Sequence, residues 1–303
     1  MDTNKNSYTI IYATVLVVFV AAVLAFVSSS LKDKQQKNVD VEKQLSLLSA
    51  VGLGQDAAAA PDKVAYVEDE FSKYIVESYV VTSSGEMADI AKSAESKSAV
   101  VNSTAFKVDM KEEFDLMKRI AIAPADKVEE MKAGLKLPVF VCTLPSGETV
   151  YIVSCYGAGL WGPIWGYVAL RSDFNTIYGA VFAHKGETPG LGAEIATPPF
   201  SNQFKNKEIF EGDKLTSVSV VKGGAAPGNL HEVDAISGGT ITSNALDQTL
   251  KSWLGYYLPY FNKMRELAAT PMPLTMAADS TVAGAAMVET QAEAQVGNPD
   301  KTK

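Results

Sequence analysis

The chain has 303 residues, 47% of them hydrophobic, and a formal net charge of −8 at pH 7. This length allows one large or two smaller domains, and the acidic balance argues against a nucleic-acid-binding protein, which needs a basic surface. With only two histidines, His184 and His231, and two cysteines, Cys142 and Cys155, the chain is too poor in ligands for a zinc cage, an iron–sulfur cluster or a disulfide-dense scaffold.

An uncharged apolar segment, Tyr8–Val27, lies close to the amino terminus. Its 20 residues would extend about 30 Å as a helix, which matches the hydrocarbon thickness of a bilayer. The segment is longer than the apolar part of a signal peptide, and Lys5 is the only lysine before it. We therefore predict a retained transmembrane anchor over residues 1–30. The lysines after the span exceed the positive charges before it by about one, which mildly favours a cytoplasmic C-terminal body but is too small a margin to fix the orientation.

Residues 31–61 are predicted to form a juxtamembrane helix and a linker. Leu31–Val51 interleaves lysine and glutamine with valine and leucine, and we interpret it as a solvated helical stalk. Gly52–Pro61 (GLGQDAAAAP) is expected to end this helix. The globular domain is predicted over residues 62–267, with helical and strand-like patterns mixed in Asp62–Asp115.

Two segments rich in β-branched residues, Pro138–Thr143 and Thr149–Cys155, are predicted to pair as a hairpin. A two-residue turn at Ser146-Gly147 would place Cys142 opposite Tyr151, about four residues from Cys155 and too far for a disulfide. Both cysteines are therefore expected to be free and buried. Further strands are predicted over Tyr167–Leu170, Thr176–His184 and Lys214–Lys222.

Three segments combine glycines with side chains that suit a binding site. Gly157–Gly166 adds two tryptophans to its glycines, which favours either a loop that approaches a ligand closely or a tightly packed turn. His184–Glu194 (HKGETPGLGAE) contains a strong turn signal, yet it lacks the complete fingerprint of any nucleotide-binding loop. Asp234–Ser243 (DAISGGTITS) gathers hydroxyl and carboxyl side chains around two adjacent glycines.

Apolar residues recur with helical spacing after Asn244, and this helix is expected to end or bend at Pro259. Thr242 or Ser243 is the predicted N-cap. An N-capped helix alone does not require both Thr240 and Thr242. A hydrolase nucleophile is disfavoured because the chain has no G-x-S-x-G elbow and no histidine that the sequence places beside Thr240. Ala268–Lys303 is predicted to be a disordered tail from its composition.

The segment DAISGGTITS resembles the motif Ser/Thr-Gly-Ala-Thr-x-Thr/Ser of FMN-binding domains that carry flavin covalently. His184–Gly192 resembles the glycine-rich flavin loop of that family, and Gly159–Leu170 resembles its preceding loop and strand. With the anchor and the polar helix, the chain is similar from about residue 8 to residue 266 to the C subunit of sodium-translocating NADH:quinone reductases. The nearest rival family is the homologous electron-transport subunit of Rnf-type ferredoxin:NAD oxidoreductase complexes. Gly239 replaces the alanine of the motif, and the C-terminal tail has no counterpart.

The resemblance implies an α+β fold, in which a single N-terminal transmembrane helix precedes an FMN-binding domain with a mainly antiparallel sheet and flanking helices. It implies one FMN per chain, joined through its phosphate to Thr240, or alternatively to Thr242, by a separate flavin transferase. The expected surroundings of the attachment point are Ser237, Gly238, Gly239 and Asp234. The expected contacts of the flavin ring are Thr188, Gly190 and Leu191, with Leu160, Trp161 and Trp165 as further candidates.

The implied function is electron relay between partner redox subunits of a sodium-pumping NADH:quinone oxidoreductase. By the same resemblance, the FMN domain would lie on the periplasmic side of a bacterial inner membrane. No dinucleotide-binding fingerprint occurs in the chain, so NADH and quinone sites are expected on partner subunits. A membrane-anchored binding or scaffold protein without redox activity is the competing class.

Overall fold

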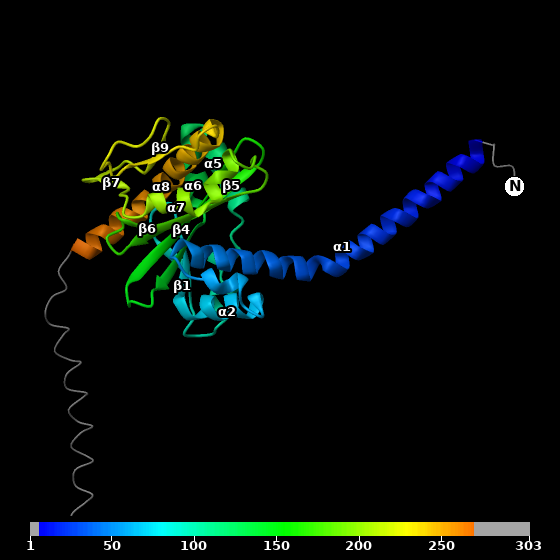
Figure 1. Cartoon of the computed structure of the whole chain (residues 1–303), viewed down its shortest axis with the longest axis horizontal. Helices are drawn as coiled ribbons and strands as arrows, with labels where there is room; N and C mark the ends of the chain where they lie inside the picture. The colour runs from blue at the N-terminus through cyan, green and yellow to red at the C-terminus, as the bar shows by residue number, and fades with distance from the viewer. Residues whose placement is uncertain (1–5, 270–303) are drawn as a thin grey trace, which may run out of the picture.

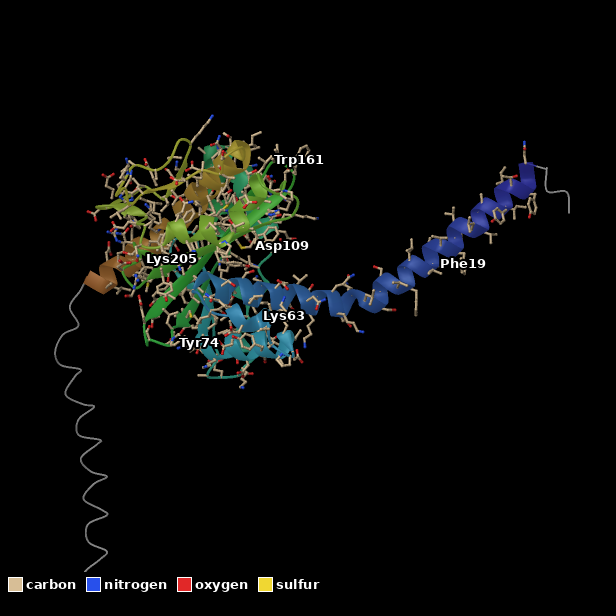
Figure 2. The ribbon with its side chains drawn as sticks, viewed as in Figure 1. Phe19, Lys63, Tyr74, Asp109, Trp161 and Lys205 are labelled. Atoms are coloured by element: carbon tan, nitrogen blue, oxygen red, sulfur yellow. The ribbon has the colours of Figure 1, made fainter. Side chains whose placement is uncertain are left out.

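The N-terminal helix projects far from the body of the protein. The computed structural model describes residues 6–269 and is shown in Figure 1, so the predicted tail lies almost wholly outside the described residues. Helix α1 (Asn6–Ala50) is the only helix of this described part that is long and apolar enough to cross a membrane. Its apolar side chains are exposed along this segment, as Phe19 shows in Figure 2. The predicted anchor is therefore helical and has the length and composition of a membrane span.

The last turns of α1 belong to the core of the body. Val41, Leu47 and Leu48 are buried against the sheet and α2 (Lys63–Tyr74), so the prediction of a solvated stalk is wrong for this part of the helix. The helix ends in a Schellman motif, in which Gly52 has a φ of 75° and the N–H of Leu53 donates to the carbonyl of Leu48 at 2.9 Å. The predicted linker contains the short helix η1 (Gln55–Ala58).

The body is built around a six-stranded antiparallel sheet in the order β2-β1-β3-β4-β5-β6. This sheet and its flanking helices confirm the predicted α+β fold. The strands are β1 (Ile75–Val81), β2 (Met87–Lys92), β3 (Leu137–Thr143), β4 (Thr149–Ala158), β5 (Pro163–Arg171) and β6 (Ile177–His184).

The two faces of the sheet form two apolar cores, because side chains alternate between the faces along each strand. The first core holds Phe140, Cys142 and Ile152 beneath α1, α2 and the short helices α3 (Ala99–Asn102) and α4 (Thr104–Lys107). The second holds Val153 and Cys155 beneath α5 (Met110–Ala121), α6 (Ala125–Ala133) and α8 (Thr240–Ala269). Both cysteines are free and buried, as predicted, and they lie on opposite faces of the sheet.

The register of the β3–β4 hairpin differs by one residue from the prediction. Cys142 pairs with Val150 and not with Tyr151. The N–H of Leu144 donates to Glu148 at 2.8 Å, and Gly147 has a φ of 85°. The connection is therefore a three-residue loop that ends in a left-handed glycine, instead of a two-residue turn.

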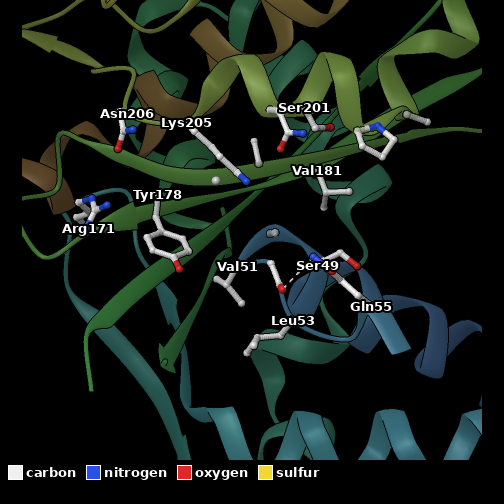
Figure 3. A pocket seen from close by; sticks show the side chains of 17 residues that line it. Ser49, Val51, Leu53, Gln55, Arg171, Tyr178, Val181, Ser201, Lys205 and Asn206 are labelled. Atoms are coloured by element: carbon white, nitrogen blue, oxygen red, sulfur yellow. Dashed lines mark hydrogen bonds between the residues drawn. The ribbon is translucent and has the colours of Figure 1, made fainter. Parts of the chain in front are cut away.

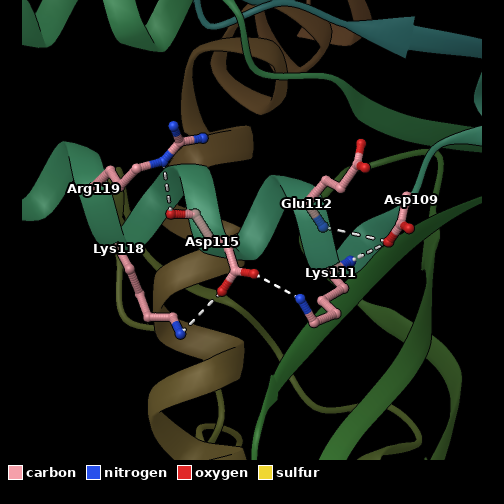
Figure 4. A network of polar contacts seen from close by, with 6 residues as sticks. All are labelled: Asp109, Lys111, Glu112, Asp115, Lys118 and Arg119. Carbon is pink, nitrogen blue, oxygen red and sulfur yellow. Dashed lines mark hydrogen bonds and ion pairs between the residues drawn. The ribbon is translucent and has the colours of Figure 1, made fainter.

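Polar contacts fix the start of α5 at the surface, as Figure 4 shows. Asp109 caps the helix by accepting from the backbone N–H groups of Lys111 at 2.8 Å and Glu112 at 3.3 Å. Asp115 binds the ammonium groups of Lys111 at 2.9 Å and Lys118 at 3.1 Å, and these hydrogen bonds hold the pKa of Asp115 below its usual value. The opposite side of α5 carries the buried residues that pack on the sheet.

The predicted strand Lys214–Lys222 is interrupted at Ser217, which has a φ of 64°. Its first end, β8 (Lys214–Leu215), pairs in antiparallel fashion with β7 (Phe210–Glu211), and its second end, β9 (Ser219–Val221), pairs in parallel with β10 (Glu232–Asp234). The remaining elements are η2 (Gly192–Ala196), α7 (Pro198–Ser201) and η3 (Asn202–Phe204).

Helix α8 begins four residues earlier than the apolar pattern suggested and continues through Pro259. Ser243 is therefore inside the first turn and does not cap the helix; its hydroxyl accepts from the N–H of Ile236 at 3.0 Å. Two buried side chains hold α8 to the sheet: Trp253 donates to the carbonyl of Tyr156 at 2.6 Å, and Tyr257 donates to that of Pro138 at 2.7 Å. These contacts fix the direction in which the helix start points.

Candidate functional site

The three glycine-containing segments singled out in the sequence meet at the start of α8. They are the β4–β5 loop (159–162), the loop that follows β6 (185–192) and the turn 237–242. Together they enclose a hollow of about 240 Å³. Its lining residues are Leu160, Glu187, Thr188, Leu191, Gly192, Gly238, Gly239, Thr240, Ile241 and Thr242. Segments separated by as much as 80 residues in the chain therefore form one site.

The central side chain of this site is Glu187, which is not among the site residues predicted from the sequence. It is 4% exposed and accepts two hydrogen bonds, from the N–H of Trp161 at 2.9 Å and from the hydroxyl of Thr242 at 2.5 Å. Its own N–H donates to the imidazole of His184 at 3.2 Å. One carboxylate thus joins all three segments. In the sequence, the only indication of this role of Glu187 was an acidic residue close to the glycines of the loop.

Two of the glycines make room for this carboxylate. A Cβ atom added at Gly159 would lie 2.6 Å from Oε1 of Glu187, and one added at Gly192 would lie 2.6 Å from Oε2. At Gly192 the added atom would also overlap the hydroxyl of Thr242. These two glycines are therefore required by the internal packing of the site. Gly190, with a φ of 75° and no atom within 4 Å of an added Cβ, faces open space instead.

The turn before α8 depends on Gly238 more than on Gly239. Gly238 has a φ of 74°, and a Cβ added there would lie 2.5 Å from Cδ2 of Leu191. Gly239 is buried but is not in the left-handed region; its added Cβ would lie 3.0 Å from Cγ2 of Ile236. An alanine at 239, as in the motif that the sequence resembles, needs only a small shift of Ile236.

The two candidate threonines have opposite environments. Thr240 is exposed and is the first residue of α8, so its hydroxyl is free to react at the rim of the hollow. Thr242 is 2% exposed, and its hydroxyl is engaged by Glu187. The N–H groups in the first turn of a helix have no partner within the helix, and the helix dipole there favours negative charge. A phosphate on Thr240 therefore fits this position electrostatically.

Two of the predicted ring contacts, Leu160 and Leu191, line the hollow beside Thr240 together with Ile241, which was not predicted, and they offer an apolar surface. Leu160, Leu191 and Ile241 are 46%, 41% and 57% exposed. Trp161 is 69% exposed and projects from the edge of the body in Figure 2. Large exposed apolar side chains that gather at a hollow are typical of a binding site. This surface, together with the helix start, fits a planar flavin ring that carries a phosphate.

The loop after β6 is shaped by its own hydrogen bonds. The carbonyl of Thr188 accepts from the N–H groups of Leu191 and Ala193, both at 3.1 Å. The N–H of Gly190 donates to the carboxylate of Glu194 at 3.0 Å. These bonds leave Thr188 and Leu191 on the wall of the hollow.

Five predicted residues lie outside the lining of the hollow, namely Asp234, Ser237, Gly190, Trp161 and Trp165. The carboxylate of Asp234 accepts from the N–H of Ala225 at 2.7 Å and so stabilises the loop before β10. Ser237 is exposed on the turn but does not line the hollow. Trp165 packs with Tyr167 against residues of α1, on the opposite face of the sheet, and so lies away from the hollow at which the ring contacts are expected. Side chains alternate between the two faces of the sheet along β5, and this alternation places Trp165 on the face opposite the hollow.

Comparisons with known proteins show to which family the chain is similar. Residues 159–255, which contain all three segments, match the family model of the FMN-binding domain. The chain is 30% identical over 267 residues to the C subunit of the Na(+)-translocating NADH-quinone reductase of Vibrio anguillarum, which covers 88% of this chain and 96% of that protein. It is 28% identical over 262 residues to the corresponding protein of Yersinia pestis, covering 85% and 92% of the two chains.

Two solved structures are also similar to the chain. The crystal structure of the C subunit of the Na(+)-translocating NADH-quinone reductase from Parabacteroides distasonis has a TM-score of 0.57 and 35% identity, covering 76% of this chain and 96% of that one. The structure of Shewanella oneidensis NqrC has a TM-score of 0.55 and 27% identity, covering 75% and 98%.

Proposed function

Because the chain belongs to the NqrC family, the C subunits of sodium-translocating NADH-quinone reductases, we propose that it carries FMN covalently on Thr240 and passes electrons between partner redox subunits. The observation that supports the position most directly is the contrast between the exposed hydroxyl of Thr240 and the buried, hydrogen-bonded hydroxyl of Thr242.

The attachment reaction needs an accessible hydroxyl and a place for the phosphate. A flavin transferase supplies an activated flavin phosphate. Oγ1 of Thr240 would bond to phosphorus and its proton would pass to the leaving group of the donor, which would also take the electron pair of the P–O bond that breaks. Ser237 and Gly238 are exposed beside Thr240, which gives the transferase access to the turn. The N–H groups at the start of α8 stabilise the charge of the resulting phosphodiester.

The same site orients the flavin ring. Leu160, Trp161 and Leu191 provide apolar surface for the ring, and Thr188 and Gly190 present polar and backbone atoms of the neighbouring loop. When bound, FMN supplies the electron-transfer chemistry, and the protein sets its orientation and its electrostatic surroundings. Glu187 keeps both loops in place around the ring because it holds them to the turn that bears Thr240.

Helix α1 would anchor the chain in a bacterial inner membrane, with the FMN domain on the periplasmic side. The apolar composition and length of α1 support the anchor, and family membership supports the orientation. The other subunits of the complex would be the electron donors and acceptors. A tethered flavin suits such a relay because it stays bound between turnovers.

The experiment that tests this function is co-expression of the full chain with a flavin transferase, followed by denaturation, washing and peptide mass mapping. We expect visible flavin absorbance in the denatured protein and an added FMN phosphoryl mass on Thr240. Thr240→Val should abolish the attachment, Thr240→Ser should retain it, and Thr242→Val should leave the added mass on residue 240.

Two results would count against the proposal. A chain without a covalent chromophore after co-expression would exclude the flavoprotein function in favour of a scaffold without redox activity. An added mass on Thr242 in the unsubstituted chain would reject Thr240 as the attachment residue but retain the function.

A further inference from the structure

A second, larger cavity lies away from the site at Thr240, between the end of α1 and the segment β6–α7–η3 (Figure 3). Its volume is about 750 Å³, compared with about 240 Å³ for the hollow at Thr240. The two cavities share no lining residue. A volume of this size is within the range of small-molecule sites.

The charged side chains of this cavity are all cationic. Figure 3 shows 17 lining residues, all within the described part of the chain, and none of them is an aspartate or a glutamate. Arg171 lies 5.2 Å from the ring centre of Tyr178 and is already paired with Glu148. The ammonium group of Lys205 has no hydrogen bond or ion pair with any of residues 6–269, and it points toward the cavity in Figure 3. The cavity therefore offers an unpaired positive charge within a protein of net charge −8.

Ser201 is an independent sign that a ligand belongs here. It is only 8% exposed, and its hydroxyl has no hydrogen-bond partner among the described residues. Leaving such a group unsatisfied is unfavourable, so buried hydroxyls without partners are uncommon. Ser201 lines the same cavity as Lys205, which follows it by four residues in the chain. Because this hydroxyl oxygen has almost no exposed surface, it reaches a ligand after rotation about the Cα–Cβ bond, and a ligand oxygen can then accept from both side chains.

The rest of the wall includes apolar side chains. Val51 and Leu53, in the turn after α1, lie across the cavity from Val181 of β6 in Figure 3. Pro198 of α7 also lines the cavity. A ligand with only an ionic group would leave this surface unused. We propose that the cavity binds a small organic anion, whose carboxylate or phosphate contacts Lys205 and Ser201 and whose short apolar body lies against these side chains.

Such a ligand would connect α1 to the body of the protein. One wall is formed by the last residues of α1 and the turn after it, and the other by β6 and α7. A bound anion would stabilise the docking of the anchor helix on the sheet, since it contacts both walls at once. This role is independent of the flavin site.

The test is calorimetric titration of the full-length, FMN-loaded chain in detergent at low ionic strength. Hexanoate and phenyl phosphate serve as organic anions, and acetate and inorganic phosphate serve as anions without a comparable apolar body. We expect saturable binding at one site, at least tenfold tighter for an organic anion than for acetate and inorganic phosphate. Lys205→Gln should weaken that binding at least tenfold, and Ser201→Ala about tenfold to a hundredfold, the range expected for one hydrogen bond to a charged group.

Lys127→Gln is the matched control, because Lys127 is an exposed lysine on α6 that does not line the cavity. It should bind the organic anions with unchanged affinity. The proposal is overturned if none of the four anions binds saturably, or if Lys205→Gln binds as tightly as the unsubstituted chain. Equal affinity for inorganic phosphate and phenyl phosphate would also overturn it, since the apolar wall would then contribute nothing.

Discussion

Replacing Glu187 tests whether one carboxylate holds the flavin site together. In Glu187→Ala, the N–H of Trp161 and the hydroxyl of Thr242 both lose their acceptor, and Thr242 is too buried to replace it with water. A hydrogen bond to a charged group contributes about 1.5–3 kcal/mol. We therefore expect the free energy of unfolding to fall by about 3–5 kcal/mol, which is large compared with most single substitutions.

The measurement is urea unfolding of the flavin-free, full-length chain in detergent, followed by tryptophan fluorescence. A double-mutant cycle with Glu187→Ala and Thr242→Val isolates the bond between these two side chains, and its coupling energy should be about 1–2 kcal/mol. Glu194→Gln is the control, because Glu194 lies in the same part of the chain and accepts only from the exposed N–H of Gly190. It should change the free energy of unfolding by less than about 1 kcal/mol.

The yield of covalent flavin gives a second measurement of the same substitution. If Glu187 fixes the turn through Thr242, Glu187→Ala should reduce the FMN attached at Thr240 under conditions in which the chain remains folded. A loss of unfolding free energy below about 1 kcal/mol in Glu187→Ala, or a coupling energy near zero, would refute the reasoning that this carboxylate joins the three segments.

Three further predictions concern other parts of the chain. Gly238→Ala should lower the free energy of unfolding by about 1–2 kcal/mol in the same urea assay, because φ is 74° and the new Cβ displaces Leu191; no loss would contradict the left-handed turn. Burial lowers the pKa of Lys43 to about 8, despite the nearby Asp40 and Asp109, so the unfolded state binds more protons between pH 8 and 10.5. Stability should therefore rise with pH across that window, by at most about 3 kcal/mol, and Lys43→Met should remove the rise in unfolding experiments at several pH values. Burial raises the pKa of both cysteine thiols to about 12, so iodoacetamide at pH 7 should label Cys142 and Cys155 only after unfolding, as mass spectrometry would show.

Local patterns in the sequence were sufficient for much of the fold. The uncharged run Tyr8–Val27 predicted the apolar helix, and runs of β-branched residues predicted β3 to β6. Strand alternation did not, however, reveal that Cys142 and Cys155 lie on opposite faces, since that depends on the register of the hairpin. The solvated stalk was wrong because a helix with mixed polar and apolar residues becomes a core element wherever another surface covers its apolar side.

The sequence by itself determined which segments could form the site, through their glycines and hydroxyls and through their resemblance to a family of flavin-binding domains. It could not separate Thr240 from Thr242, because both are threonines two residues apart. Only the tertiary structure gave them different environments: packing against Glu187 buries one hydroxyl, while the start of α8 leaves the other exposed. The role of Glu187 and the cavity at Lys205 also depend on contacts between distant segments, and such contacts exist only once the chain has folded.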